Sequence, residues 1–316
     1  MVKFCHHNLL RVVAALLMLG LCPFTWAVTK KPIKKAVVAK PVTPKAPAKI
    51  AEPKVSPEPL APGELPLVAQ AAALVDSKTG NLIYQKRADQ LQYPASTTKI
   101  LTALLVIEAG DLDKLVTVEL ADTKVEPSAL YIKPGEQFPR RHLLYALLLK
   151  SANDVAMCLA RDNAGSVAGF ADKMNLRCGQ LGAINSNFTN PHGLHDPHHF
   201  TTASDLAQIA MAAMKNPIFR DIVATPEAWL LKGEQFVLLR NHNRLLWRFP
   251  GCIGLKTGFT NAAQQVLVSS AMRQGSEVIS VVMHSDRAGI WNDSSSLLLY
   301  GFERLGIPPP IAESPK

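Results

Sequence analysis

Three short polar strings occur in order along this 316-residue chain, and together their side chains have the chemistry for acyl transfer. They are Ser-Thr-Thr-Lys at 96–99, Ser-Ala-Asn at 151–153 and Lys-Thr-Gly at 256–258. They supply hydroxyl nucleophiles, two amines that can move a proton or bind an anion, and an amide. This inventory suits a serine ester mechanism that needs no histidine. Each string alone is common, and a second Lys-Thr-Gly occurs at 78–80, so the prediction rests on their combination and order.

The first string places a nucleophile beside a candidate base. Ser96 and Lys99 lie three residues apart at the predicted start of a helix, which brings both side chains to one helix face. A lysine can remove the proton of a serine only if its pKa falls. The apolar helix would desolvate Lys99, and Lys256 would add a neighbouring positive charge. The alternative is an N-cap serine beside a surface lysine.

The other two strings would complete a site for a peptide. Ser151 and Asn153 fall on a predicted tight corner between two apolar helices, where they could relay a proton and hold a carbonyl, or simply cap a helix. On a predicted strand, Lys256 and Gly258 point to one side and Thr257 to the other. A lysine there suits a terminal carboxylate, and a glycine admits a close backbone. The alternative is a surface lysine on a strand.

A second candidate site is a histidine-rich loop. Four histidines and an aspartate lie within residues 192–199, a set that could bind a divalent metal. Prolines and a glycine interrupt the segment, and no helical pair of histidines at i and i+4 frames a site. We therefore interpret the segment as a structural loop, and we predict no metal and no organic cofactor.

The N-terminus predicts export. Residues 1–27 combine Lys3 and Arg11 with an apolar run at 12–22 and small residues before a cleavage point after Ala27, which is typical of a secretory signal peptide. The alternative is an uncleaved membrane anchor, although the run is short for a bilayer span. Either interpretation predicts a periplasmic, cell-envelope or extracellular protein.

Residues 28–67 form a predicted disordered linker with nine prolines, eight lysines and no aromatic residue. Eight lysines against three glutamates give it a charge of +5, residues 1–27 add +2, and residues 68–316 carry only +2 of the chain's +9. The basic balance therefore does not predict a nucleic-acid partner. The linker is either a solvated spacer or makes weak contact with anionic envelope polymers. We place the folded domain at 68–307 and a short tail at 308–316.

The periodicity of the folded part predicts one sheet built from both ends of the domain. Helical patterns extend from 100 to about 110, from 141 to 214 and from 293 to 305. Strand patterns occur at 71–75, 81–84, 229–231, 236–239, 253–257, 265–271 and 277–284. Strands at both ends with helices between them predict an α+β fold, with one antiparallel sheet and helices on its faces.

The chain resembles the low-molecular-mass penicillin-binding proteins, serine-type D-alanyl-D-alanine carboxypeptidases of peptidase family S11. Besides the three strings, the stretches 93–100, 130–135, 190–194 with 201–205, and 241–246 resemble family segments in the same order, over about residues 68–305. The resemblance implies a β-lactamase/transpeptidase-like fold. In that fold an antiparallel sheet is flanked by helices, with an all-α insertion between the N- and C-terminal strands.

The resemblance also implies a role for each matching residue. It assigns catalysis to Ser96 as the acylated nucleophile, Lys99 as general base and Ser151 as proton relay. It assigns substrate binding to Asn153, Lys256, Thr257, Gly258 and Phe259, with the backbone amides of Ser96 and Phe259 as the oxyanion hole. The implied substrate is a peptidoglycan stem pentapeptide that loses its terminal D-alanine, and the implied inhibitors are β-lactams.

Three alternatives stay open at this point. Residues 256–263 resemble the branch of the family that cuts D-alanyl cross-links, so endopeptidase activity is one. A β-lactamase is another, although no glutamate lies between Asp154 and Asp205 to activate water as in the class A enzymes. The third is a penicillin-binding module without catalysis.

Overall fold

The computed structural model describes residues 64–308. The predicted signal peptide, nearly all of the predicted linker and the tail from residue 309 lie outside the described residues. Within 64–308 no helix has both the length and the apolar character needed to cross a membrane. The three cysteines in this range, Cys158, Cys178 and Cys252, are free thiols, and Cys158 and Cys178 are buried.

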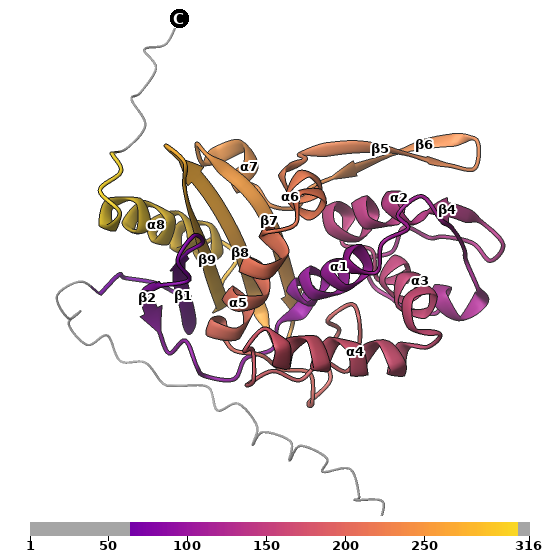
Figure 1. The fold of residues 1–316 in the computed structure, drawn as a ribbon, viewed down its shortest axis with the longest axis horizontal. Helices are drawn as coiled ribbons and strands as arrows, with labels where there is room; N and C mark the ends of the chain where they lie inside the picture. Colours follow the sequence, from indigo (N-terminus) through magenta and orange to yellow (C-terminus); the bar gives the residue numbers. More distant parts are fainter. Residues whose placement is uncertain (1–63, 309–316) are drawn as a thin grey trace, which may run out of the picture. The chain divides into compact units, whose positions relative to one another are not determined.

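The core of the fold is a five-stranded antiparallel sheet in the order β2-β1-β9-β8-β7 (Figure 1). Its strands are β1 (Ala71–Asp76), β2 (Leu82–Lys86), β7 (Cys252–Thr260), β8 (Gln264–Arg273) and β9 (Ser276–Ser285). The predicted assembly from both ends of the domain is confirmed, because β1 pairs with β9. The strand that carries Lys256, β7, lies at the edge of the sheet, where one side of its backbone is open to a partner.

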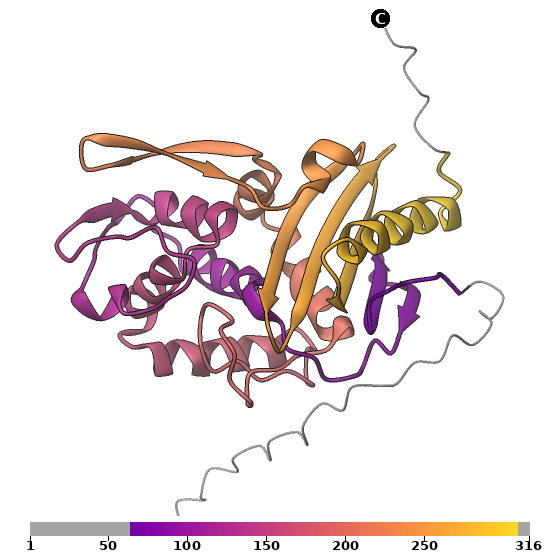
Figure 2. The same ribbon diagram turned by 180° about the vertical axis from the view of Figure 1, so that it is seen from behind.

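Helices cover both faces of the sheet. The C-terminal helix α8 (Gly289–Arg304) lies across one face (Figure 2). Its Asp293 carboxylate accepts backbone N–H bonds from Val68 at 3.0 Å and Ala69 at 2.8 Å, which ties the helix to the chain that enters β1. On the other face lie α5 (Ala203–Met214), α6 (Pro217–Ala224) and the 3₁₀ turn η1 (Ala95–Thr98), which leads into α1 (Lys99–Glu108).

The region between the N- and C-terminal strands is largely helical, as the resemblance implies, but it is not all-α because it also contains two two-stranded sheets. It contains α2 (Arg140–Tyr145), the π-helical turn η3 (Ala146–Lys150), α3 (Asn153–Ala164) and α4 (Val167–Gln180). Small elements complete the described fold: β3 (Leu115–Thr117) with β4 (Gln137–Pro139), the hairpin β5 (Glu227–Lys232) with β6 (Gln235–Arg240), η2 (Leu120–Thr123) and α7 (Leu245–Arg248). Helix is confirmed over most of 141–214, but 181–202 is a long irregular loop that includes the histidine-rich segment.

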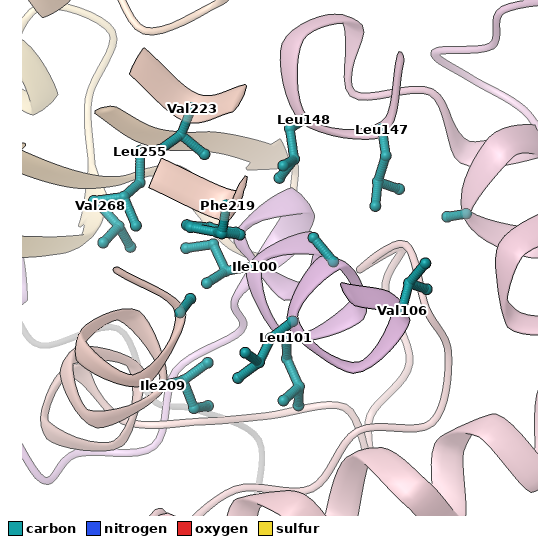
Figure 3. Close-up of a cluster of buried hydrophobic side chains, with 14 of the residues drawn as sticks. Ile100, Leu101, Val106, Leu147, Leu148, Ile209, Phe219, Val223, Leu255 and Val268 are labelled. Carbon is teal, nitrogen blue, oxygen red and sulfur yellow. The ribbon is translucent and has the colours of Figure 1, made fainter. Parts of the chain in front are cut away.

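Helix α1 is the centre of the larger hydrophobic core. Every residue from Lys99 to Leu104 is buried. Figure 3 shows Ile100 and Leu101 between Leu147 and Leu148 of η3, Ile209 of α5 and Phe219 of α6, with Leu255 and Val268 of the sheet nearby. The first half of the helix, which begins with the candidate base, is therefore packed within the core.

We expect Leu101→Ala to lower the free energy of unfolding by about 2–5 kcal/mol, since Leu101 is fully buried and truncation leaves a cavity. Urea denaturation of the purified domain measures this. The matched control is Leu120→Ala, whose side chain is 61% exposed and whose loss should change stability by less than about 0.5 kcal/mol. Equal effects at the two sites would contradict the central position of α1.

Candidate active site

The nucleophile and the candidate base meet at the junction of two helical elements. Ser96 lies in η1, one turn before α1 begins at Lys99. This agrees with the predicted position of Ser96 at the start of a helix, and the structure shows that the first turn is a 3₁₀ turn. The predicted proximity is confirmed, because Lys99 Nζ lies 3.0 Å from Ser96 Oγ. Ser96 is half-buried, whereas Lys99 is fully buried.

The amine of Lys99 has two further fixed partners. Its Nζ donates to Asn153 Oδ1 at 2.7 Å and to the backbone carbonyl of His192 at 2.7 Å. A neutral amine has two N–H bonds and one lone pair, so these two acceptors use both N–H bonds. The lone pair is then left for the hydroxyl proton of Ser96. When the amine is neutral, this geometry therefore allows it to act as a general base toward Ser96.

Burial and charge both favour the neutral form of this amine. Desolvation lowers the pKa of Lys99 well below its usual value, and the positive charge of Lys256 lowers it further, while Asp154 acts in the opposite direction. The two causes are the ones that the sequence predicts for a lysine base. The Asp154 carboxylate does not pair with Lys99 but accepts hydrogen bonds from the backbone N–H groups of Leu130 and Ile132.

The corner at 151–153 is confirmed and has a defined local cause. The π-helical turn η3 ends at Lys150, Ser151 adopts a left-handed conformation with φ of 64°, and α3 starts at Asn153. The Nδ2 of Asn153 donates to the carbonyl of Pro127, which fixes the amide so that its oxygen faces Lys99. Ser151 is 5% exposed at the same corner.

The third string approaches Ser96 from the sheet. A Cβ built on Gly258 would lie 2.8 Å from the backbone nitrogen of Ser96 and 3.0 Å from Ala95 Cβ, so only glycine lets β7 lie this close to η1. The structure thus shows a close approach of η1 to Gly258, and the close approach of a substrate backbone at this glycine stays a prediction. The neighbouring Phe259 has its side chain 53% exposed.

Lys256 and Thr257 face opposite sides of β7, as the strand alternation predicts. Lys256 is 1% exposed, its Nζ donates to the Thr257 carbonyl at 2.9 Å, and burial lowers its pKa to about 7. Thr257 is only partly buried and lines a cavity to which α7 and α8 also contribute residues. The two side chains are thus available to different parts of a bound ligand.

The histidine-rich loop supports the nucleophile turn. Gly193 has φ of +87°, and a Cβ there would lie 1.7 Å from the Ala95 carbonyl, so the loop packs directly on η1. His199 accepts the Thr189 N–H at Nδ1 (3.1 Å), so its Nε2 carries the proton and donates to Thr98 Oγ1 at 2.8 Å. Within residues 64–308 no group of three or more His, Cys, Asp or Glu residues is arranged to hold a metal.

The sequence reasoning missed the backbone contribution of this loop. The His192 carbonyl fixes the Lys99 amine, whereas the sequence predicts only a structural loop or a metal ligand at His192 and no contact with Lys99. Thr102 Oγ1 donates to the Pro191 carbonyl at 2.7 Å and anchors the same loop to α1. The Gly193 within a Pro-His-Gly string was the available signal, since a glycine in a turn-rich loop often marks a close approach.

Comparison with known proteins gives consistent matches across the folded part. A family model described as D-alanyl-D-alanine carboxypeptidase (Peptidase_S11) matches residues 58–287. The D-alanyl-D-alanine carboxypeptidase DacB2 of Mycobacterium tuberculosis is 37% identical over 240 residues, covering 74% of this chain and 82% of that protein. A crystal structure of a D-alanyl-D-alanine carboxypeptidase from M. tuberculosis H37Rv aligns with a TM-score of 0.73 at 35% identity, covering 78% of this chain and 96% of the other.

One further relative bears on the alternatives. The D-alanyl-D-alanine endopeptidase of Pseudomonas aeruginosa is 31% identical over 236 residues, which cover 72% of this chain and 76% of that protein. Similarity therefore extends to proteins named for either of two peptidase activities.

We expect Gly258→Ala to slow acylation of Ser96 by at least about 100-fold, because the added methyl would push β7 away from the Ser96 amide, one of the two amides that the resemblance implies as oxyanion donors. Stopped-flow reaction with a fluorescent penicillin measures the rate. Gly179→Ala is the matched control, since a Cβ in α4 meets nothing within 4 Å. An unaffected Gly258→Ala rate would contradict the close approach.

Lys256→Ala should move the acid limb of the acylation rate profile to higher pH. The substitution removes a positive charge that lowers the pKa of Lys99, so that pKa rises and the neutral fraction of Lys99 at a given pH falls. The rate of acylation by benzylpenicillin between pH 5 and 10 shows the shift. Lys78→Ala, in the exposed turn of the second Lys-Thr-Gly string, should leave the limb in place. If the acid limb of the rate profile of Lys256→Ala stays in place or moves to lower pH, the charge of Lys256 does not lower the pKa of Lys99.

Proposed function

This chain belongs to the D-alanyl-D-alanine carboxypeptidase family that its sequence resembles, peptidase family S11, and we propose that Ser96 forms its acyl-enzyme. The family and the β-lactamase-like fold are both confirmed. The protein is therefore a serine D-alanyl-D-alanine carboxypeptidase, which acts on peptidoglycan stem peptides. The observation that carries the proposal for Ser96 is its 3.0 Å approach to the buried amine of Lys99.

Acylation uses the hydrogen-bond set around Lys99. The neutral amine takes the hydroxyl proton of Ser96 while Oγ attacks the carbonyl carbon of the penultimate D-alanine. The Ser96 and Phe259 amides bind the oxyanion, and the nearness of β7 to Ser96 favours this arrangement. The Lys256 ammonium binds the terminal carboxylate. That anion raises the pKa of Lys256 again from its value of about 7 and keeps the ammonium charged in the complex.

The leaving group needs a proton before the peptide bond can break. The proton taken by Lys99 passes through Ser151 to the nitrogen of the departing D-alanine. The C–N bond breaks, and the acyl group remains on Ser96 Oγ. Asn153 and Thr257 orient the peptide between the corner and the strand.

Hydrolysis of the ester completes the cycle. Water loses a proton to Lys99 and attacks the acyl carbon, and the Ser96 oxygen leaves with the proton that Lys99 returns. Class A β-lactamases use an additional glutamate to activate water for rapid deacylation. Residues 155–204 contain no glutamate, so we propose that the ester formed with a β-lactam persists. β-Lactams would then inhibit the protein, and it would not act as a β-lactamase.

Two parts of the proposal concern residues outside the described range. We propose that residues 1–27 direct export and are cleaved after Ala27, and that the Pro- and Lys-rich segment spaces the peptidase from that end. The site then faces its substrate in the periplasm or cell envelope.

A second candidate activity is cleavage of D-alanyl cross-links. The similarity to the P. aeruginosa endopeptidase favours it. The bond broken again follows a D-alanyl carbonyl, so the same nucleophile and base serve both reactions.

Ser96→Ala should abolish both release of D-alanine from a stem pentapeptide and the covalent adduct with benzylpenicillin, because no other group replaces the nucleophile. Mass spectrometry of the peptides and of the intact protein measures both. Ser166→Ala, an N-cap residue of α4, is the control and should keep both activities. Equal turnover by wild type and Ser96→Ala would exclude the serine mechanism. Benzylpenicillin turnover without a lasting adduct would instead indicate a β-lactamase.

A further inference from the structure

A basic cavity adjoins the catalytic strand on the side where Thr257 points. Its volume is about 770 Å³, and Thr257 and His242 are among the residues that line it. Three arginines also line it, Arg240, Arg244 and Arg248, whereas none of its lining residues is acidic. A cavity of this size lies within the range of about 300–1,000 Å³ of small-molecule sites. Its charge favours an anionic ligand.

Two of the three arginines are placed by aromatic side chains. The Arg240 guanidinium lies 5.3 Å from the ring centre of Trp247, and that of Arg244 lies 5.6 Å from Trp291. Arg240 also pairs with Glu227 at 3.2 Å. Arg244 and Arg248 form no salt bridge with any residue in the part of the chain that the structure describes. A guanidinium stacked on an indole keeps its N–H edge for a carboxylate.

Residues that line the cavity interact with the lysines of the catalytic centre. Thr257, on its wall, accepts the hydrogen bond of Lys256 Nζ through its carbonyl. His242, on the same wall, has its pKa lowered by desolvation and then by the charges of Lys256, Lys150 and Lys99. His242 therefore lies within electrostatic reach of both catalytic lysines and is neutral near pH 7.

The position of the cavity relative to the scissile bond follows from the proposed mechanism, on which this inference rests. The acyl carbonyl lies at the Ser96 and Phe259 amides, and the carboxylate of the departing residue lies at Lys256. The strand therefore has an acyl end at Phe259 and a leaving-group end at Lys256 and Thr257. The cavity adjoins the leaving-group end, and a single alanine fills only a small part of it.

We propose that this cavity, which we call the leaving-group cavity, binds a leaving group larger than one residue. The ligand is a carboxylate-bearing peptide whose amine is acylated by D-alanine, as in cross-linked stem peptides. Arg244 and Arg248 pair with its carboxylates, and Trp247 and Trp291 pack against its aliphatic parts. In the reaction, Ser96 Oγ forms the ester, the amide C–N bond breaks, and the whole acceptor peptide leaves as an amine with the proton relayed from Ser96. Water then releases the donor peptide.

The test compares two substrates with one enzyme. Purified 28–316 protein is incubated with a pentapeptide muropeptide monomer and with a cross-linked dimer, and mass spectrometry gives kcat/KM for each. We expect the wild type to cleave both substrates. The double variant Arg244→Ala/Arg248→Ala should lower the ratio of dimer to monomer kcat/KM at least 10-fold. Added NaCl should lower the same ratio in the wild type, because salt screens the arginine–carboxylate pairs.

The matched control removes two exposed positive charges outside the cavity, in Lys215→Ala/Arg304→Ala, and should keep the wild-type ratio. Acylation of each variant by benzylpenicillin verifies that the catalytic centre is folded. If the wild type cleaves monomers and leaves dimers intact, the proposed role of the leaving-group cavity is wrong, whereas the carboxypeptidase mechanism is unaffected. An unchanged ratio of dimer to monomer kcat/KM in Arg244→Ala/Arg248→Ala would also contradict the proposed role of the cavity. Inactivity of the wild type on both substrates would overturn the mechanism itself.

Discussion

The hydrogen bonds of one buried amine constrain much of this structure. Lys99 Nζ is held by Asn153 Oδ1, the His192 carbonyl and Ser96 Oγ, at 2.7, 2.7 and 3.0 Å. These partners come from the corner before α3, from the long loop after α4 and from η1. A charged amine in this position would carry a large desolvation cost. The neutral amine avoids that cost and can accept the serine proton.

Several local features are consequences of bringing those partners to one point. The π-helical turn η3 and the left-handed Ser151 turn the chain so that α3 begins with Asn153 at the amine. Gly193 lets the histidine-rich loop pack against the Ala95 carbonyl, and Gly258 lets β7 pack against the Ser96 amide. Both glycines serve contacts with η1, so the nucleophile is positioned by backbone packing on two sides.

The sequence predicted the parts of the site that depend on local periodicity. The i, i+3 spacing of Ser96 and Lys99, the corner at 151–153 and the alternation of Lys256 and Thr257 all follow from the geometry of helices and strands. The resemblance supplied the fold and the order of the strings. What could not be predicted depends on contacts between distant segments. The His192 carbonyl carries no side-chain signal, and the cavity beside Thr257 forms only when the segment 240–248, β7 and α8 meet.

The pKa of the Lys99 amine, on which its role as a neutral base depends, can be measured directly. Lysine labelled with ¹³C at Cε gives an NMR shift that reports the charge of each amine, and comparison with Lys99→Arg assigns the resonance. We predict that Lys99 titrates well below the usual lysine value of 10.5, because it is buried and lies near Lys256. A midpoint near 10.5 would show that Lys99 is a cation at neutral pH. In that case another group would have to take the proton of Ser96.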